Sequence, residues 1–175
     1  MRVRSFALSD LGQIVRIERA SFGPEAYSVT TFLAHLFRDR KGLLVVEDEE
    51  GRVAGYALAR VGLRWLGVRR GGITSVAVEP AQRRRGLGRA LLRATLEYLK
   101  ENGVEAADLE VDVSNRAAQS LYEAFGFVPS RVIPHYYGPN KDGLKMVLSL
   151  RQASADGQNA VAGGKLLPNG RQRMR

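Results

Sequence analysis

The sequence predicts an α/β fold built on a mixed β-sheet, and three observations point to that class. Apolar residues recur at helical spacing in some segments, and in shorter segments they alternate with polar residues or run together. The two kinds of segment follow the order β-α-α-β-β-β-α-β-α-β-β, with no internal repeat. Short turns join some neighbouring strands and a helix joins others, so one sheet should contain both antiparallel and parallel pairs.

The first part of the chain predicts a strand followed by two helices. Residues 2–6 alternate polar and apolar side chains, as a half-buried strand does. Ser9 is a candidate N-cap for a helix whose apolar residues follow at helical spacing, and Gly23-Pro24 ends that helix. Ser28 is a candidate N-cap for a second helix, which continues through Phe37.

Three predicted strands occupy the middle of the chain. A short apolar strand covers residues 43–46, and the turn residues 48–51 connect it to a longer strand over residues 53–61. The glycine- and arginine-rich segment 64–72 predicts a loop. Residues 73–78 then form a buried strand.

In the last part of the predicted domain, strands alternate with two helices. Leucines at helical spacing mark the first helix over residues 87–99, and Asn102-Gly103 is a good C-cap for it. The second helix begins at the cap residues Ser114-Asn115 and ends before Gly126. The strands around these helices are residues 107–113, 127–133 and 145–150.

Composition limits the classes of protein to which this chain can belong. Its 175 residues fit one domain of ordinary size, expected over residues 1–150. The absence of cysteine excludes disulfide scaffolds, cysteine nucleophiles and cysteine–zinc sites, and with only two histidines we expect no metal. No apolar run is long enough to cross a membrane and the N-terminus lacks an apolar signal region, so we expect a cytoplasmic protein.

The net charge of +9 indicates an anionic partner, such as nucleic acid, a ribosome surface or a phosphorylated cofactor. Charge alone does not choose among these partners, and no nucleic-acid-binding motif stands out. Residues 151–175 are rich in small, polar and glycine residues and end in a run of arginines. We expect this segment to be a flexible basic tail, either passive or able to bind nucleic acid.

The most informative segment lies between a predicted buried strand and a predicted helix. Arg83–Arg85 precede Gly86 and Gly88, and an apolar-periodic helix begins at once. Glycines let the backbone approach an anion, free N–H groups at a helix start point at it, and arginines add charged hydrogen bonds, so we expect a diphosphate-bearing ligand here. Two alternatives remain open: a solvated charge run beside an ordinary loop, and a dinucleotide site that lacks its third glycine.

A second segment makes this pattern specific. It reads L-E-V-D-V-S-N-R-A-A-Q-S-L-Y-E-A-F-G-F over residues 109–127. Together with the R-x-x-G-x-G pattern over residues 83–88, it resembles the GNAT superfamily of acetyl-CoA-dependent N-acetyltransferases. The resemblance covers residues 1–150. It implies the GNAT fold, in which helices flank a mixed sheet whose central strand is splayed and bulged.

Two loops extend the resemblance to N-terminal (Nα) acetyltransferases. Pro24–Tyr27 is similar to the P-E-N-Y loop of archaeal and eukaryotic catalytic subunits, and His135–Gly138 is similar to their paired-tyrosine loop. Bacterial ribosomal-protein alanine acetyltransferases share the L-E-V and S-N-x-x-A-x-x-L-Y parts. The chain departs from the family at Ala26, where the loop has asparagine, and at Asp112, where an arginine usually follows Glu-Val.

The resemblance implies how acetyl-CoA is bound as the cosubstrate. In the family, the bulged strand exposes N–H groups to the pantetheine arm and the thioester carbonyl, and Val76, Ala77 and Val78 match that position. Asn115 would contact the cofactor arm, and Tyr122 would lie near the sulfur. The pyrophosphate would lie on the segment formed by Arg83, Arg84, Arg85, Gly86, Leu87, Gly88, Arg89 and Ala90.

Acetyl transfer by direct attack needs a proton acceptor and a proton donor. A protein α-amine has a pKa of about 7.7–8.0, so a modest base is sufficient, directly or through water. Glu110, at the end of a predicted strand, is the candidate base, and its alternative is an ordinary carboxylate paired with a lysine or arginine. The resemblance implies Tyr122 as the acid for the leaving thiolate, and its alternative is core packing. Asn115 could serve only as an N-cap.

The resemblance also places the acceptor peptide between two loops. Glu25 and Tyr27 on one side, and Tyr136 and Tyr137 on the other, are the candidate substrate-binding residues. The alternative for Glu25 is an ordinary surface charge. The alternative for Tyr136 and Tyr137 is packing within a hairpin.

We therefore expect transfer of an acetyl group to the α-amine of protein N-termini that begin with Ser, Ala, Thr, Gly or Met. One alternative acceptor is a lysine side chain or a small-molecule amine. An alternative of another class is a basic ribosome- or RNA-binding protein that uses this fold as a scaffold. Proximity to the ribosome fits the first expectation too, and the sequence leaves the oligomeric state open, with a monomer compatible.

Overall fold

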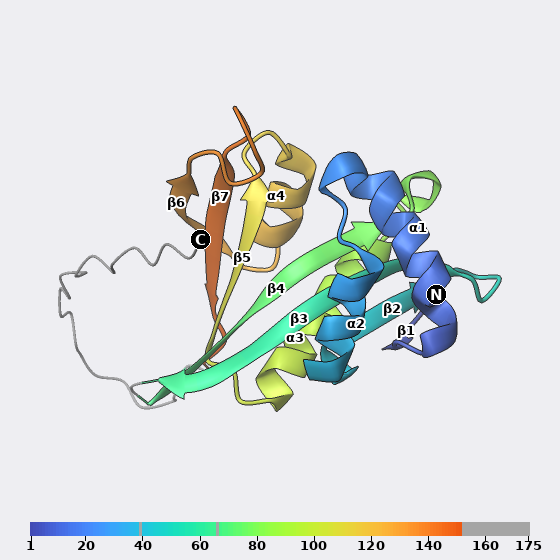
Figure 1. The fold of residues 1–175 in the computed structure, drawn as a ribbon. Coiled ribbons are helices and arrows are strands. Elements are labelled where there is room, and N and C mark those ends of the chain that lie inside the picture. The colour runs from blue at the N-terminus through green and yellow to red at the C-terminus, as the bar shows by residue number, and fades with distance from the viewer. Residues whose placement is uncertain (39, 66, 152–175) are drawn as a thin grey trace.

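The fold is a seven-stranded sheet with helices on both faces (Figure 1). The computed structural model describes residues 1–38, 40–65 and 67–151. The strands are β1 (Arg2–Ser5), β2 (Leu43–Glu47), β3 (Val53–Trp65), β4 (Val68–Val78), β5 (Ala106–Asp112), β6 (Val128–Ile133) and β7 (Gly143–Ser149). The helices are α1 (Leu11–Phe22), α2 (Val29–Arg38), α3 (Leu87–Glu101) and α4 (Arg116–Glu123).

Neighbouring strands follow the order β1-β2-β3-β4-β5-β7-β6. Among the described strands, β4 and β5 form the one parallel pair, and every other neighbouring pair is antiparallel. Helix α3 provides the crossover between the two parallel strands. The predicted α/β class, the mixed sheet and the predicted order of elements are confirmed.

The predicted loop over residues 64–72 is wrong, because residues 64–65 belong to β3 and residues 68–72 belong to β4, which pair as a hairpin. Arg64 pairs with Arg69 across this hairpin. The glycines of the segment suggested a loop, but the strand requires one of them for close packing. A Cβ at Gly72 would lie 2.6 Å from Asp108 Oδ1 and 2.7 Å from the Asp108 carbonyl oxygen. Glycine therefore permits the close approach of β4 to β5 at this point.

Side-chain caps begin two helices as predicted. Ser28 Oγ and Asn115 Oδ1 each accept a hydrogen bond from the N–H group three residues later, at 3.2 and 3.1 Å. The predicted cap Ser9 is wrong, since Asp10 occupies the N-cap position of α1. Asp10 is 3% exposed, and its carboxylate forms a 2.7 Å ion pair with Arg4, which fixes the residue at the helix start.

The two helical layers pack on opposite faces of the sheet (Figure 1). Helices α1 and α2 cover one face, named here the α1 face, and α3 and α4 cover the other, the α3 face. The core of the α1 face includes Ile14, Ile17, Phe32, Leu43, Val45, Tyr56, Leu58 and Ala77. The core of the α3 face includes Leu92, Leu96, Leu99, Leu109, Val111, Tyr122 and Phe127. Because strand side chains alternate, Ser75 on β4 and Glu110 on β5 point toward the α1 face.

Strands β4 and β5 separate after a short parallel contact, which opens a gap in the middle of the sheet (Figure 1). They pair only through residues 70–72, and the pairing of β4 with β3 skips Thr74, the extra residue of a bulge. The Glu79 N–H donates to a carbonyl of the β3 strand. By alternation, the N–H groups of Val76 and Val78 point away from β3, into the gap. The predicted splayed and bulged central strand is confirmed.

Candidate active site

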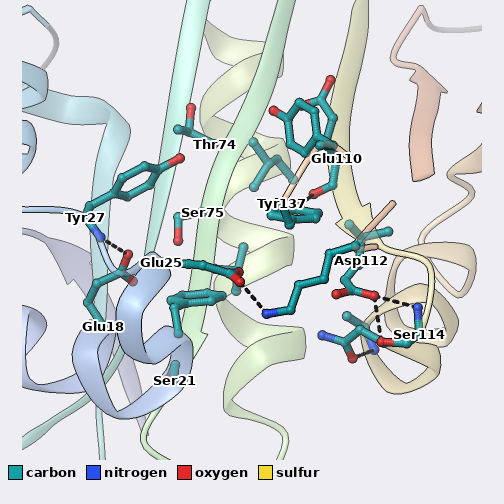
Figure 2. A pocket seen from close by; sticks show the side chains of 18 of the residues that line it. Glu18, Ser21, Glu25, Tyr27, Thr74, Ser75, Glu110, Asp112, Ser114 and Tyr137 are labelled. Atoms are coloured by element: carbon teal, nitrogen blue, oxygen red, sulfur yellow. Dashed lines mark hydrogen bonds and ion pairs between the residues drawn. The ribbon is translucent and has the colours of Figure 1, made fainter. Parts of the chain in front are cut away.

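A cavity of about 730 Å³ lies at the gap between β4 and β5 (Figure 2). Its walls come from the end of α1 and the loop after it, from β4 and β5, from the start of α4 and from the loop between β6 and β7. Ala77, Val78 and residues 83–90 do not line it but lie next to it, at the end of β4 and the start of α3. The predicted site residues that line it are Glu25, Tyr27, Val76, Glu110, Asn115, Tyr122, Tyr136 and Tyr137.

The loop between α1 and α2 forms one wall of the cavity. Glu18, near the end of α1, is 1% exposed and accepts a 2.9 Å hydrogen bond from the Tyr27 N–H. Glu25 forms an ion pair with Lys141 of the β6–β7 loop, across the cavity (Figure 2). Burial raises the pKa of the Tyr27 hydroxyl, and the charges of Glu18 and Glu110 add to this shift. The Glu18 carboxylate thus holds this wall from the protein interior, and the Glu25 carboxylate links it to the opposite loop.

The loop between β6 and β7 forms the opposite wall. The Tyr137 hydroxyl donates a 2.9 Å hydrogen bond to the Glu110 carbonyl oxygen, which holds this loop on β5. The Tyr136 ring packs edge-on against the Tyr137 ring with centroids 4.8 Å apart, and Tyr136 remains half exposed. Burial raises the pKa of both hydroxyl groups, so both stay protonated at neutral pH.

Glu110 lies on β5 and faces the α1 side of the gap. Its carboxylate accepts a 3.1 Å hydrogen bond from Lys145 Nζ, and the same ammonium lies 2.7 Å from Asp108 Oδ2. Burial lowers the pKa of Lys145, but the hydrogen bonds with these two carboxylates outweigh it and raise the pKa overall. Glu110 is therefore an ion-paired carboxylate, as the alternative interpretation allowed, and it is also part of the cavity wall.

Tyr122 reaches the cavity from the α3 face. It is 8% exposed, and its ring packs edge-on against Phe127 with centroids 5.9 Å apart. Burial raises the pKa of the Tyr122 hydroxyl to about 12. No residue in the described part of the chain forms a hydrogen bond with this hydroxyl. At neutral pH the Tyr122 hydroxyl therefore carries a proton that a molecule in the cavity can receive.

The start of α3 presents free backbone N–H groups beside the cavity. Gly86 precedes the helix with φ at +83°, a left-handed conformation that favours glycine. Within the described ranges, no group accepts a hydrogen bond from the N–H groups of residues 87–89. A Cβ at Gly88 would lie 3.5 Å from Leu121 Cδ2, so the first turn of α3 packs directly on α4. This helix start can bind an anion next to the helix that carries Tyr122.

The three predicted arginines lie around this helix start. The Arg83 guanidinium donates a 3.4 Å hydrogen bond to Ser21 Oγ, at the cavity wall. Arg85 donates to the side chain of Gln82, and Arg84 has a left-handed φ of +63°. All three arginines are exposed, so their charges are accessible to an anion at the helix start.

Asn115 combines the two roles that the sequence left open. Its Oδ1 caps α4, and the residue also lines the cavity. None of the described residues accepts a hydrogen bond from its Nδ2 group. The cap therefore leaves the amide donor of Asn115 available to a ligand.

Sequence reasoning missed several residues that line the cavity, among them Glu18, Ser75 and Lys141. Glu18 follows Ile14 by four positions on the apolar stripe of α1, so a carboxylate inside that stripe was the available signal. Ser75 lies in a correctly predicted strand, but nothing in a single strand shows that its neighbour strand turns away. Lys141 lies in a loop, where the pattern carries no such information.

The described part of the chain contains neither a cluster of metal ligands nor a helix suited to cross a membrane. Among residues 1–38, 40–65 and 67–151, no group of three or more His, Cys, Asp or Glu side chains could hold a metal ion. None of the helices in these ranges has the length and apolarity that a membrane crossing requires. The predicted tail over residues 151–175 lies outside the described residues, apart from Arg151.

Comparisons with known proteins agree with this geometry. The acetyltransferase (GNAT) family matches residues 11–127. An N-alpha-acetyltransferase of Sulfurisphaera tokodaii is 36% identical over 157 residues, which cover 85% of this chain and 93% of that protein. The ribosomal-protein-S18-alanine N-acetyltransferase from Escherichia coli has a structure similar at a TM-score of 0.73 and 27% identity, covering 90% of this chain and 99% of that chain. A structure of the NatC complex bound to Gag peptide and CoA shares the fold at a TM-score of 0.80 and 22% identity, covering 86% of this chain and 98% of that chain.

Proposed function

The chain belongs to the acetyltransferase (GNAT) family and is an acetyl-CoA-dependent N-acetyltransferase, and we propose that its acceptor is the α-amine of protein N-termini. One observation carries this proposal. A single cavity extends from Tyr122 and Asn115 on the α3 face, through the gap between β4 and β5, to Glu25 and Tyr136 on the side of the α1 face. Two substrates can therefore enter from opposite faces and meet in the gap.

The α3 side of the cavity fits acetyl-CoA. The N–H groups of residues 87–89 and the arginines before them would hold the pyrophosphate. The N–H groups of Val76 and Val78, which point into the gap, and the free amide donor of Asn115 would hold the pantetheine arm. Ala77 belongs to the same strand segment, but its N–H points toward β3. When bound, acetyl-CoA supplies the acetyl thioester.

Tyr122 is the proposed proton donor. Its hydroxyl keeps its proton at neutral pH, and none of the described residues takes that proton in a hydrogen bond. It lies on the same helix as the cap residue Asn115, at the α3 side of the gap. Tyr122 Oη would therefore hold the proton that a departing thiolate requires.

Glu110 is the proposed proton acceptor. Its carboxylate faces the α1 side of the gap, where the amine would enter, and Lys145 holds it in place. Glu110 would take a proton from the amine directly or through a water molecule. An α-amine, with a pKa of about 7.7–8.0, asks little of this base, whereas a lysine side chain, with a pKa of about 10.4, asks much more.

The α1 side of the cavity fits a cationic peptide N-terminus. Among the described residues that line the cavity, carboxylates outnumber ammonium groups, and one of these carboxylates, Glu25, is paired with Lys141. The aromatic side chains of Tyr27, Tyr136 and Tyr137 would enclose the first residues of the peptide. We propose that N-termini beginning with Ser, Ala, Thr, Gly or Met are the substrates, and the name of the archaeal N-alpha-acetyltransferase relative supports an α-amine acceptor.

A panel of peptides tests this function. The protein is incubated with acetyl-CoA and peptides that begin with Ser, Ala, Thr, Gly or Met, each paired with an N-terminally blocked copy that contains lysine. Mass spectrometry should find one acetyl group on each accepted free α-amine and none on the blocked copies. Transfer to the blocked copies would move the acceptor to the lysine side chain. Transfer to none of the peptides would overturn the proposal.

A further inference from the structure

A hydrogen-bonded chain of three side chains runs from the interior to the cavity wall. The Tyr56 hydroxyl donates to Glu18 Oε2, and the same hydroxyl lies 2.9 Å from Ser75 Oγ. Glu18 and Tyr56 are almost fully buried, and Ser75 lines the cavity. Figure 2 shows Ser75 on the same side of the cavity as Glu18 and Tyr27, opposite Glu110. The mechanism proposed above uses none of the three residues of this chain.

Glu18 is a buried carboxylate with no cationic partner among the described residues. Burial raises the pKa of Glu18, and the hydrogen bonds from the Tyr27 N–H and the Tyr56 hydroxyl act in the opposite direction and favour the ionised form. The two groups that form hydrogen bonds with its carboxylate, the Tyr27 N–H and the Tyr56 hydroxyl, are both donors. An ionised carboxylate accepts hydrogen bonds and donates none, so these contacts match it. A neutral amide would fill the same space without the cost of a buried charge. The position therefore calls for a group that only accepts.

The hydrogen bond that the Tyr56 hydroxyl donates to Glu18 Oε2 fixes the direction of the hydrogen bonds among the three side chains. Tyr56 has one hydroxyl proton and gives it to Glu18, so the Ser75 hydroxyl must donate its own proton to the Tyr56 oxygen. Ser75 then has no proton left for the cavity. It presents only the lone pairs of Oγ, and it can bind only a donor there.

We propose that Ser75 Oγ accepts a hydrogen bond from the acceptor amine, and that Glu18 and Tyr56 are positioning residues that keep Ser75 an acceptor. The inference rests on the proposed function, because it concerns the amine that enters from the α1 face. Ser75 and Glu110 both point toward that face, one from each strand that borders the gap. An amine between them meets an acceptor on both sides, and both acceptors favour a terminus with a free amine over one that lacks the amine.

The test compares a peptide that begins with serine with its desamino analogue, in which hydrogen replaces the α-amine. Dissociation constants for both peptides are measured by calorimetry with CoA present. The dissociation constant of the desamino analogue divided by that of the amine peptide reports the contribution of the amine to binding in each protein. Ser75→Ala should lower this ratio about tenfold, the effect expected for one hydrogen bond to a charged group. Ser130→Ala, at an exposed position of β6, is the matched control and should leave the ratio unchanged.

Glu18→Gln tests the positioning role separately. The new amide can still accept from the Tyr27 N–H, but its NH₂ group donates to Tyr56, so the chain reverses and Ser75 turns its proton toward the cavity. The ratio of the two dissociation constants, desamino analogue over amine peptide, should fall about tenfold, with little change in the KM for acetyl-CoA. In a Ser75→Ala background the same substitution should lower the ratio no further, because Glu18 acts through Ser75.

An unchanged ratio in Ser75→Ala overturns the inference, and so does an additive effect of Glu18→Gln in the double variant. If Glu18→Gln fails to fold, Tyr56→Phe, which cuts the chain without adding a donor, takes its place in the same double variant. Failure of the proposed function gives a different result. In that case the wild-type protein acetylates none of the peptides and binds the peptide and its desamino analogue equally.

Discussion

Replacing Tyr122 with phenylalanine should lower kcat about 100-fold and change the KM for acetyl-CoA little. General acid catalysis by a positioned side chain contributes about 10²–10⁴-fold, and the variant loses only the proton donor. The fold should be preserved, because the ring keeps its edge-on contact with Phe127 and the lost hydroxyl has no partner among the described residues. Steady-state kinetics with detection of the released thiol measures both constants.

The control for this variant is Tyr98→Phe on α3, outside the cavity lining, which should leave kcat unchanged. The direction of the pKa shift gives a second readout. Because burial raises the pKa of the Tyr122 hydroxyl to about 12, this group stays protonated through the ordinary assay range. The wild-type rate should therefore show no alkaline loss from Tyr122 below about pH 10. A Tyr122→Phe variant with wild-type kcat would exclude Tyr122 as the proton donor.

Replacing Glu110 with glutamine should lower kcat about 100-fold at pH 7. The amide keeps the size of the carboxylate but cannot take the proton of the acceptor amine. The deficit should shrink as the pH rises through the pKa of the α-amine, about 7.7–8.0, because the amine then enters without its extra proton. Peptide acetylation measured from about pH 6.5 to 9 checks both the size of the loss and its direction with pH.

Asp108→Asn is the matched control for Glu110→Gln. Both carboxylates contact Lys145, but Asp108 does not line the cavity. Loss of the ion pair alone should therefore change kcat by no more than about threefold. Equal losses in the two variants would mean that Glu110 serves the Lys145 ion pair and does not act as the base.

Local patterns predicted most of the fold, because they depend on residues near one another in the chain. The leucine spacing of α3 and the caps at Ser28 and Asn115 need only a few neighbouring residues. The error at residues 64–72 arose where a long-range contact controls the residue type. Gly72 is a glycine because Asp108 of another strand lies against it, and the local pattern could not show that neighbour.

The residues of the candidate site also fall into two groups: those that the sequence indicated and those that depend on long-range contacts. Its position at the end of a predicted strand indicated Glu110, the family resemblance indicated Tyr122, and the structure brings both to one cavity. The sequence could not indicate Glu18 or Ser75 as site residues. The hydrogen bonds that link them through Tyr56 depend on contacts between α1, β3 and β4. Glu18 and Tyr56 are 38 positions apart in the sequence, and Tyr56 and Ser75 are 19 apart. Only the assembled sheet shows that a buried carboxylate sets the hydrogen bonding of a serine at the gap.

Inhibition by bisubstrate compounds measures most directly whether the cofactor and an α-amine meet in this gap. One compound joins CoA through an acetyl bridge to the α-nitrogen of a serine-initiated peptide, and the other joins it to a lysine side-chain nitrogen in the blocked copy. We expect the α-linked compound to bind at least about 100-fold more tightly than CoA or the lysine-linked compound, since one molecule then fills both sides of the cavity. Equal inhibition by the two compounds, or tighter binding of the lysine-linked one, would contradict an α-amine acceptor at this site.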